Sequence, residues 1–113
     1  MHVVNQPLVL ATATSGANAS QAPTVTPTGT EKTVCLGYLA VTFTGGVPAA
    51  ALLVTVSDGT TTFTFPVPVA GAVFTLANAL RFAKNATLTV TVPAAGAAIT
   101  SKVDIGTFQD SVP

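Results

Sequence analysis

The chain has 113 residues, with four basic and four acidic side chains and a formal net charge of zero. Only 7% of its residues are charged, against about a quarter in an ordinary soluble domain, and 49% are hydrophobic. Because the cations are few and scattered, we expect no partnership with nucleic acid or with a membrane surface. Neutral, weakly solvated surfaces tend to associate, so the composition favours a domain that packs against other protein.

Side chains that could carry chemistry are scarce. His2 is the only histidine and Cys35 the only cysteine, so a Ser-His-Asp arrangement and a zinc site both lack their usual components. Cys35 lies between Val34 and Leu36, which is typical of a small buried hydrophobe. We therefore expect no enzymatic activity, no cofactor and no metal. No apolar run is long enough for a transmembrane helix, and the first residues lack the basic segment of a secretory signal peptide.

The first third of the chain is predicted to be extended. Residues 7–12 are apolar and β-prone and form a short first strand. In 15–32 the composition shifts to Ser, Ala, Thr, Gly and Pro, which predicts an extended arm or a long loop. We expect residues 1–33 to form this strand and arm and residues 34–113 to form a β-sandwich, within one structural domain overall.

The arm is the predicted contact segment. Its few apolar side chains are too sparse to anchor it on its own domain, so we expect it to make few contacts within its own subunit. Pro23, Val25 and Pro27 are the residues expected to contact a neighbouring subunit or the underlying shell. Their stiff, partly polyproline-like backbone would lower the entropy lost on docking.

A hairpin is the strongest local prediction. Asp58-Gly59 favours a two-residue turn, because both residues tolerate a positive φ. Strand 51–56 precedes the turn and another strand follows it. Counting outward from the turn places Val54 opposite Phe63 on a shared face.

Further strands complete an all-β fold. Segments 34–44, 87–92 and 99–108 show the alternation of half-buried strands, and 66–71, with its two prolines, is predicted to be an edge or a crossing between sheets. Residues 77–80 fit either a strand or one helical turn. About seven to eight short strands without a long amphipathic helix predict an antiparallel β-sandwich or jelly roll.

Thr-x-Thr recurs along the chain, for example at 42–44, 62–64 and 87–91. Flat threonine arrays with a constant repeat can order water as ice-binding proteins do, but the intervals here are irregular. Threonine on the outer face of β-strands is the simpler interpretation.

The stretches 53–63 (LVTVSDGTTTF) and 80–92, together with the closing strand 99–108, resemble small virion proteins of tailed bacteriophages. Those proteins are Ala/Thr/Val/Gly-rich jelly-roll or sandwich domains that decorate heads or build tail appendages. The resemblance implies a non-enzymatic structural protein on the capsid exterior that cements capsid subunits. It also implies a symmetric homo-oligomer, often a trimer, whose other partner is the major capsid protein or another virion protein.

A tail-fibre or adhesin-type domain that binds host-surface glycan is the alternative. Carbohydrate sites usually present aromatic platforms beside carboxylates and amides. This chain has no Trp and only one Tyr, Tyr38, beside Phe residues whose pattern is that of a core. The aromatic content therefore favours the capsid-decorating protein.

Overall fold

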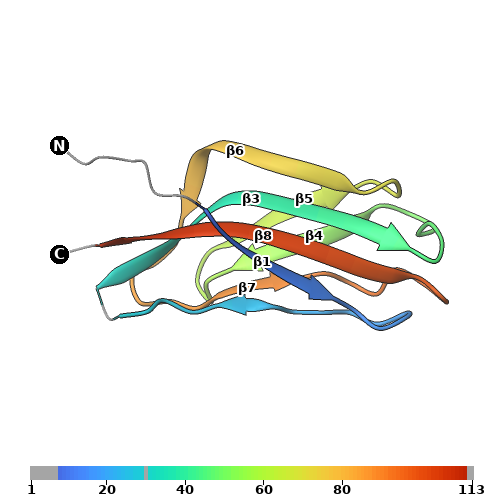
Figure 1. Ribbon diagram of the computed structural model, residues 1–113, viewed down its shortest axis with the longest axis horizontal. Coiled ribbons are helices and arrows are strands. Elements are labelled where there is room, and N and C mark those ends of the chain that lie inside the picture. The colour runs from blue at the N-terminus through green and yellow to red at the C-terminus, as the bar shows by residue number, and fades with distance from the viewer. Residues whose placement is uncertain (1–7, 30, 112–113) are drawn as a thin grey trace.

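The computed structural model describes residues 8–29 and 31–111, and in these residues it contains eight strands and no helix. The strands form two antiparallel four-stranded sheets, which confirms the predicted all-β sandwich (Figure 1). The strands are β1 (Val9–Thr14), β2 (Thr24–Val25), β3 (Lys32–Thr44), β4 (Leu52–Ser57), β5 (Thr62–Val67), β6 (Ala72–Arg81), β7 (Leu88–Thr91) and β8 (Thr100–Ser111). No helix of the described chain could therefore cross a membrane.

The first sheet has the order β1-β8-β3-β6 and the second the order β2-β7-β4-β5. The prediction for 66–71 is confirmed: Pro66 lies in β5, an edge strand, and the following residues lead across to β6 in the other sheet. Residues 77–80 belong to β6 and not to a helical turn.

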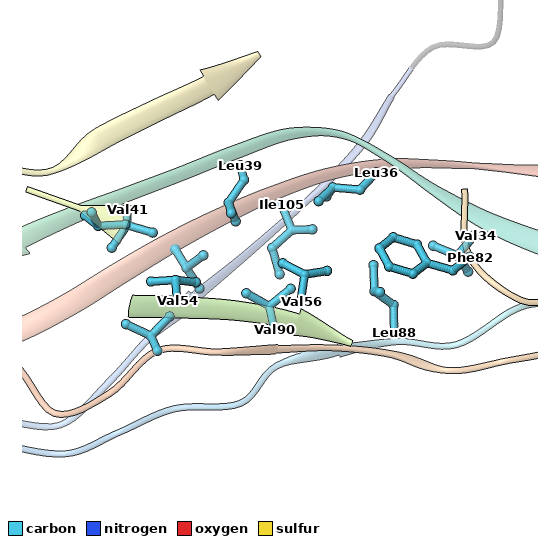
Figure 2. Close-up of a cluster of buried hydrophobic side chains, with 13 residues drawn as sticks. Val34, Leu36, Leu39, Val41, Val54, Val56, Phe82, Leu88, Val90 and Ile105 are labelled. Carbon is cyan, nitrogen blue, oxygen red and sulfur yellow. The ribbon is translucent and has the colours of Figure 1, made fainter. Parts of the chain in front are cut away.

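Side chains from the inner faces of both sheets form one hydrophobic core. Figure 2 shows Leu39 and Ile105 of the first sheet above Val54 and Val90 of the second. Complete burial of such a side chain contributes about 1.5–3 kcal/mol. The core cluster comprises Val34, Leu36, Leu39, Val41, Val54, Val56, Val67, Phe82, Leu88, Val90, Val92, Val103 and Ile105.

A β-bulge in β3 decides which of its side chains enter the core. Val34 and Leu36 are buried, and so are Leu39 and Val41, although the two pairs are out of phase for a regular strand. The pairing of β3 with both neighbours shifts between Leu36 and Tyr38, so the residue between them, glycine, is the extra one. The bulge returns the second half of β3 to the core-facing phase.

The β4–β5 hairpin lies where the sequence predicts it but has a longer loop. Residues 58–61 form a four-residue connection, and Val54 pairs with Phe65. The predicted two-residue turn and the pairing of Val54 with Phe63 are therefore wrong. The register differs by two residues, so all three side chains still share the inner face, as the period of two requires.

The longer loop follows from the side chain of Asp58. Its Oδ1 accepts the backbone N–H groups of Thr60 at 2.9 Å and Thr61 at 2.7 Å. Capture of these two N–H groups keeps their residues in the loop, whereas a two-residue turn would place them in the strand. Gly59 has a φ of 93°, the positive value that the turn prediction requires.

The arm is extended, as predicted, but the expectation that it makes few contacts within its own subunit is wrong. Gln21 exchanges backbone hydrogen bonds with Val92 at 3.0 and 2.8 Å, and β2 pairs with β7. The Gln21 side-chain amide donates to the carbonyl oxygen of Ser101 at 3.0 Å and to its hydroxyl at 2.8 Å. Main-chain pairing anchors the arm where apolar side chains are few.

Two glycines with positive φ provide a matched test of the loops. Gly59→Ala should cost only the strain of a left-handed residue, about 1 kcal/mol, because no atom lies within 4 Å of its new Cβ. Gly71→Ala has the same strain at φ 88°, and its Cβ would lie 2.7 Å from the carbonyl oxygen of Val41. Denaturant titrations should show the larger loss of unfolding free energy at Gly71. Equal losses of unfolding free energy at the two positions would contradict the close approach of Gly71 to the Val41 carbonyl oxygen.

Replacing residues 16–29 by a short Gly-Ser linker should now destabilise the whole sandwich. The change removes β2 and the hydrogen bonds of Gln21, each worth about 1 kcal/mol, and it uncovers one edge of β7. Thermal melting followed by circular dichroism measures the effect, with the outward-facing Thr24→Ser as the control. An unchanged melting temperature would show that the arm does not stabilise the sandwich.

Candidate functional site

Among the residues that the structure describes, the acidic side chains and the cysteine form no metal-binding cluster. No cluster of three or more His, Cys, Asp or Glu side chains that could hold a metal is present in 8–29 and 31–111, and His2 lies outside these ranges. The prediction for Cys35 is confirmed, since only 2% of its surface is exposed. Burial raises the pKa of its thiol despite the nearby cation of Arg81, so the group stays protonated and is a poor nucleophile.

Several charged side chains form ion pairs within the domain. Arg81 forms an ion pair with Asp110 at 2.5 Å, and Lys84 forms one with Glu31 at 3.1 Å. Such surface pairs contribute little to stability. They leave the surface with fewer unpaired charges to oppose contact with another neutral protein.

Asp58 joins two loops. Besides the two N–H groups of its own loop, its other oxygen accepts the N–H of Ala83 at 2.8 Å, in the segment after β6. These backbone hydrogen bonds, that of Thr61 the strongest, lower the pKa of the carboxyl. The carboxylate has a structural role, which agrees with the turn position predicted for it.

Strand β1 exposes apolar side chains on both of its faces. Val9 is 68% exposed and Leu10 is 66% exposed, and neighbouring residues of a strand point to opposite faces. Only Ala13 of β1 is even half-buried. The sequence signal was the unbroken run 8–10, where a half-buried strand would alternate. We predicted this strand but did not predict its exposure.

A hollow lies on the outer face of the first sheet beside β1. It has a volume of about 470 Å³ and is lined by Leu8, Leu10, Tyr38 and Asp104. Gly106 lies beside both leucines, because a Cβ at this position would be 3.2 Å from side-chain atoms of each. The missing side chain lets the two leucines lie flat on the sheet.

A second hollow adjoins the first where β6 leaves β3. Figure 1 shows the bend in β6 near its end. Leu36 pairs with Leu80 and Tyr38 with Thr75, so four residues of β6 lie opposite one residue of β3. The opening has a volume of about 560 Å³, and Leu8 lines it too. The outer face of this sheet is therefore uneven around these two hollows.

The outer face of the second sheet carries rows of hydroxyl groups. Alternation places the Thr and Ser residues outward between the buried valines and leucines of β4 and β7. The pairing register aligns them across the strands although their sequence spacing is irregular. One row contains Thr24, Thr89, Ser57 and Thr62, and the next contains Thr91, Thr55 and Thr64. The result is a neutral polar face, for which strand propensity remains the simplest explanation.

The predicted contact residues lie against their own domain. Pro23, Val25 and Pro27 are half-buried and alternate with exposed Thr24 and Thr26. Val25 packs against the core cluster. The contact of these residues with a neighbouring subunit stays a prediction, and the surface they leave outward is threonine.

Comparison with known proteins gives no relative, since no protein-family model and no curated protein matches the chain. The function of the chain must therefore be inferred from its exposed surfaces.

Asp58→Asn should destabilise the protein at neutral pH by about 1 kcal/mol, because the amide has a single acceptor oxygen and cannot accept from both loops, and because the site is solvent-accessible the loss is modest. The folded-state pKa lies below the unfolded value, so the carboxylate stabilises the fold above the unfolded pKa. That contribution is lost as the pH falls through the folded pKa, where wild type and variant should converge. Melting curves from neutral to acid pH measure this, with Asp104→Asn as the control, and a constant difference would contradict the assignment.

Proposed function

We propose that this chain is a non-enzymatic structural protein of a bacteriophage virion. It decorates the capsid exterior and stabilises the shell through contacts between its own copies and with the major capsid protein or another virion protein. The observation that carries the proposal is strand β1, whose apolar side chains are exposed on both faces in a domain with very little charge.

The whole surface supports a role in assembly. Large exposed apolar side chains such as Val9 and Leu10 favour association, because burying them removes apolar area from water. The hydroxyl rows of the second sheet offer hydrogen bonds without the desolvation cost of a charge. Two of the four cations, Arg81 and Lys84, are held in ion pairs, which leaves little with which to bind nucleic acid or an anionic membrane.

A closed homo-oligomer suits these surfaces, and the resemblance to phage virion proteins implies a trimer. A rigid sandwich with neutral faces can sit on a capsid lattice without strong electrostatic preferences. Neither a cofactor nor a metal enters this function.

A tail-fibre or adhesin-type role in glycan binding is the second candidate, because one hollow brings Tyr38 and Asp104 together. An aromatic ring beside a carboxylate is a common way to hold a sugar. One oxygen of Asp104 already accepts the hydroxyl of Thr12 at 2.6 Å, which leaves fewer acceptor positions for a ligand.

Gold-labelled antibody on purified virions of the phage that carries this gene tests the proposal. Labels should decorate the head, and particles produced without the protein should release DNA at a lower temperature. Absence of the protein from purified particles would refute the proposal. Labels confined to fibre tips, with binding to host glycan that Tyr38→Ala abolishes, would favour the adhesin role.

A further inference from the structure

We infer that the copies of this protein join edge to edge, with β1 of one copy paired to β6 of the next in a closed ring. The inference rests on the proposed function, which already assumes that copies of the chain associate. What is new is which two strands pair across the contact and in which direction they run.

The two sheets differ in how their edges are protected. In the second sheet, β5 contains Pro66, which has no N–H to donate, and β2 has only two residues, flanked by Pro23 and Pro27. These are devices that discourage strand addition. In the first sheet, β1 has six residues and β6 has ten, both without proline, and Arg81 at the end of β6 is their only charged residue. Only the first sheet therefore has two edges open to pairing.

The exposure of β1 favours strand addition over docking of a flat surface. Val9 and Leu10 face opposite sides of the sheet and are both mostly exposed. A flat partner would cover one of them. A strand added at the edge pairs with the open backbone groups and brings its own neighbours over both faces.

Strand direction identifies β6 of a second copy as the matching edge. Adjacent strands in the order β1-β8-β3-β6 are antiparallel, so β1 and β6 of one copy run in opposite directions. A copy rotated about an axis parallel to the strands keeps these directions and presents its β6 antiparallel to β1. The sheet then continues across the contact with its regular alternation.

The same contact uses both open edges of every copy. Closing the ring leaves neither β1 nor β6 unpaired, whereas a two-fold contact between two β1 strands leaves both β6 edges open. Val73 of β6 is 61% exposed and shares a row with Ala40, Asp104 and Thr12 on the outer face. It can pack against Leu10, the apolar side chain of β1 on that face.

Cysteine cross-linking distinguishes these arrangements. Thr12→Cys lies in β1 and Thr75→Cys in β6, both exposed, and the native Cys35 is too buried to react. A short bis-maleimide, which tolerates a small shift of register, should link the double variant into a ladder that ends at the ring. A mixture of the two single variants should stop at dimers. Dimers of Thr12→Cys alone, or no product while sedimentation shows an oligomer, would overturn the inference.

Charge placed at the edge gives an independent measurement. Leu10→Glu should weaken self-association by at least about tenfold, because the contact between β1 and β6 would bury a carboxylate beside that of Asp104, which lines the same hollow. Leu53→Glu is the matched control, since Leu53 is 59% exposed but lies in the second sheet. Sedimentation gives the association constants and thermal melting verifies folding. Equal association constants for the two variants, or a monomeric wild type, would overturn the proposed contact between β1 and β6. Virion labelling tests the proposed function separately.

Discussion

The antiparallel pairing of β3 with β8 places every other part of the domain. Its register runs from Lys32 opposite Ser111 to Thr44 opposite Thr100, along most of a molecule whose principal extents are 48 × 23 × 19 Å. β1 attaches to the free side of β8 and β6 to the free side of β3, so both ends of the first sheet follow from this pair. The inner face of the pair is also the surface on which the second sheet packs. A change of register here would turn the core residues of both strands outward.

The bulge at Gly37 makes the β3–β8 pair irregular at the point where a hollow opens on the outer face of the sheet. One extra residue rephases β3, and β6 departs from β3 beside it. A Cβ on Gly37 would lie 3.0 Å from Leu8, so the bulge and the leucine occupy adjoining space. The same irregularity that keeps Leu39 in the core therefore creates the hollow on the opposite face. Core packing and surface shape are linked through one glycine.

The sequence was sufficient for those features that depend on alternation alone, such as the strands around Val90 and Val103. The hairpin loop was not predictable from turn propensity, because the Asp58 side chain holds two residues that would otherwise pair. The anchoring of the arm depends on backbone hydrogen bonds with β7, which carry no composition signal. The importance of β1 was hidden as well: Val9 is exposed only because no strand of the other sheet covers it, and that is a property of topology.

Low charge changes how such a domain must achieve specificity. Charged rims usually steer a protein toward one partner and repel others. This chain has four cations and four anions, and Arg81 and Lys84 form ion pairs within the domain, so few charges remain for this purpose. Backbone edges supply direction and register instead, since antiparallel pairing admits few alignments of two strands. Pro66 contributes to selectivity by blocking strand addition at the β5 edge of the second sheet, so that pairing is directed to the edges of the first sheet. Under the proposed edge-to-edge assembly, the choice of partner is therefore decided by which strand edges stay open.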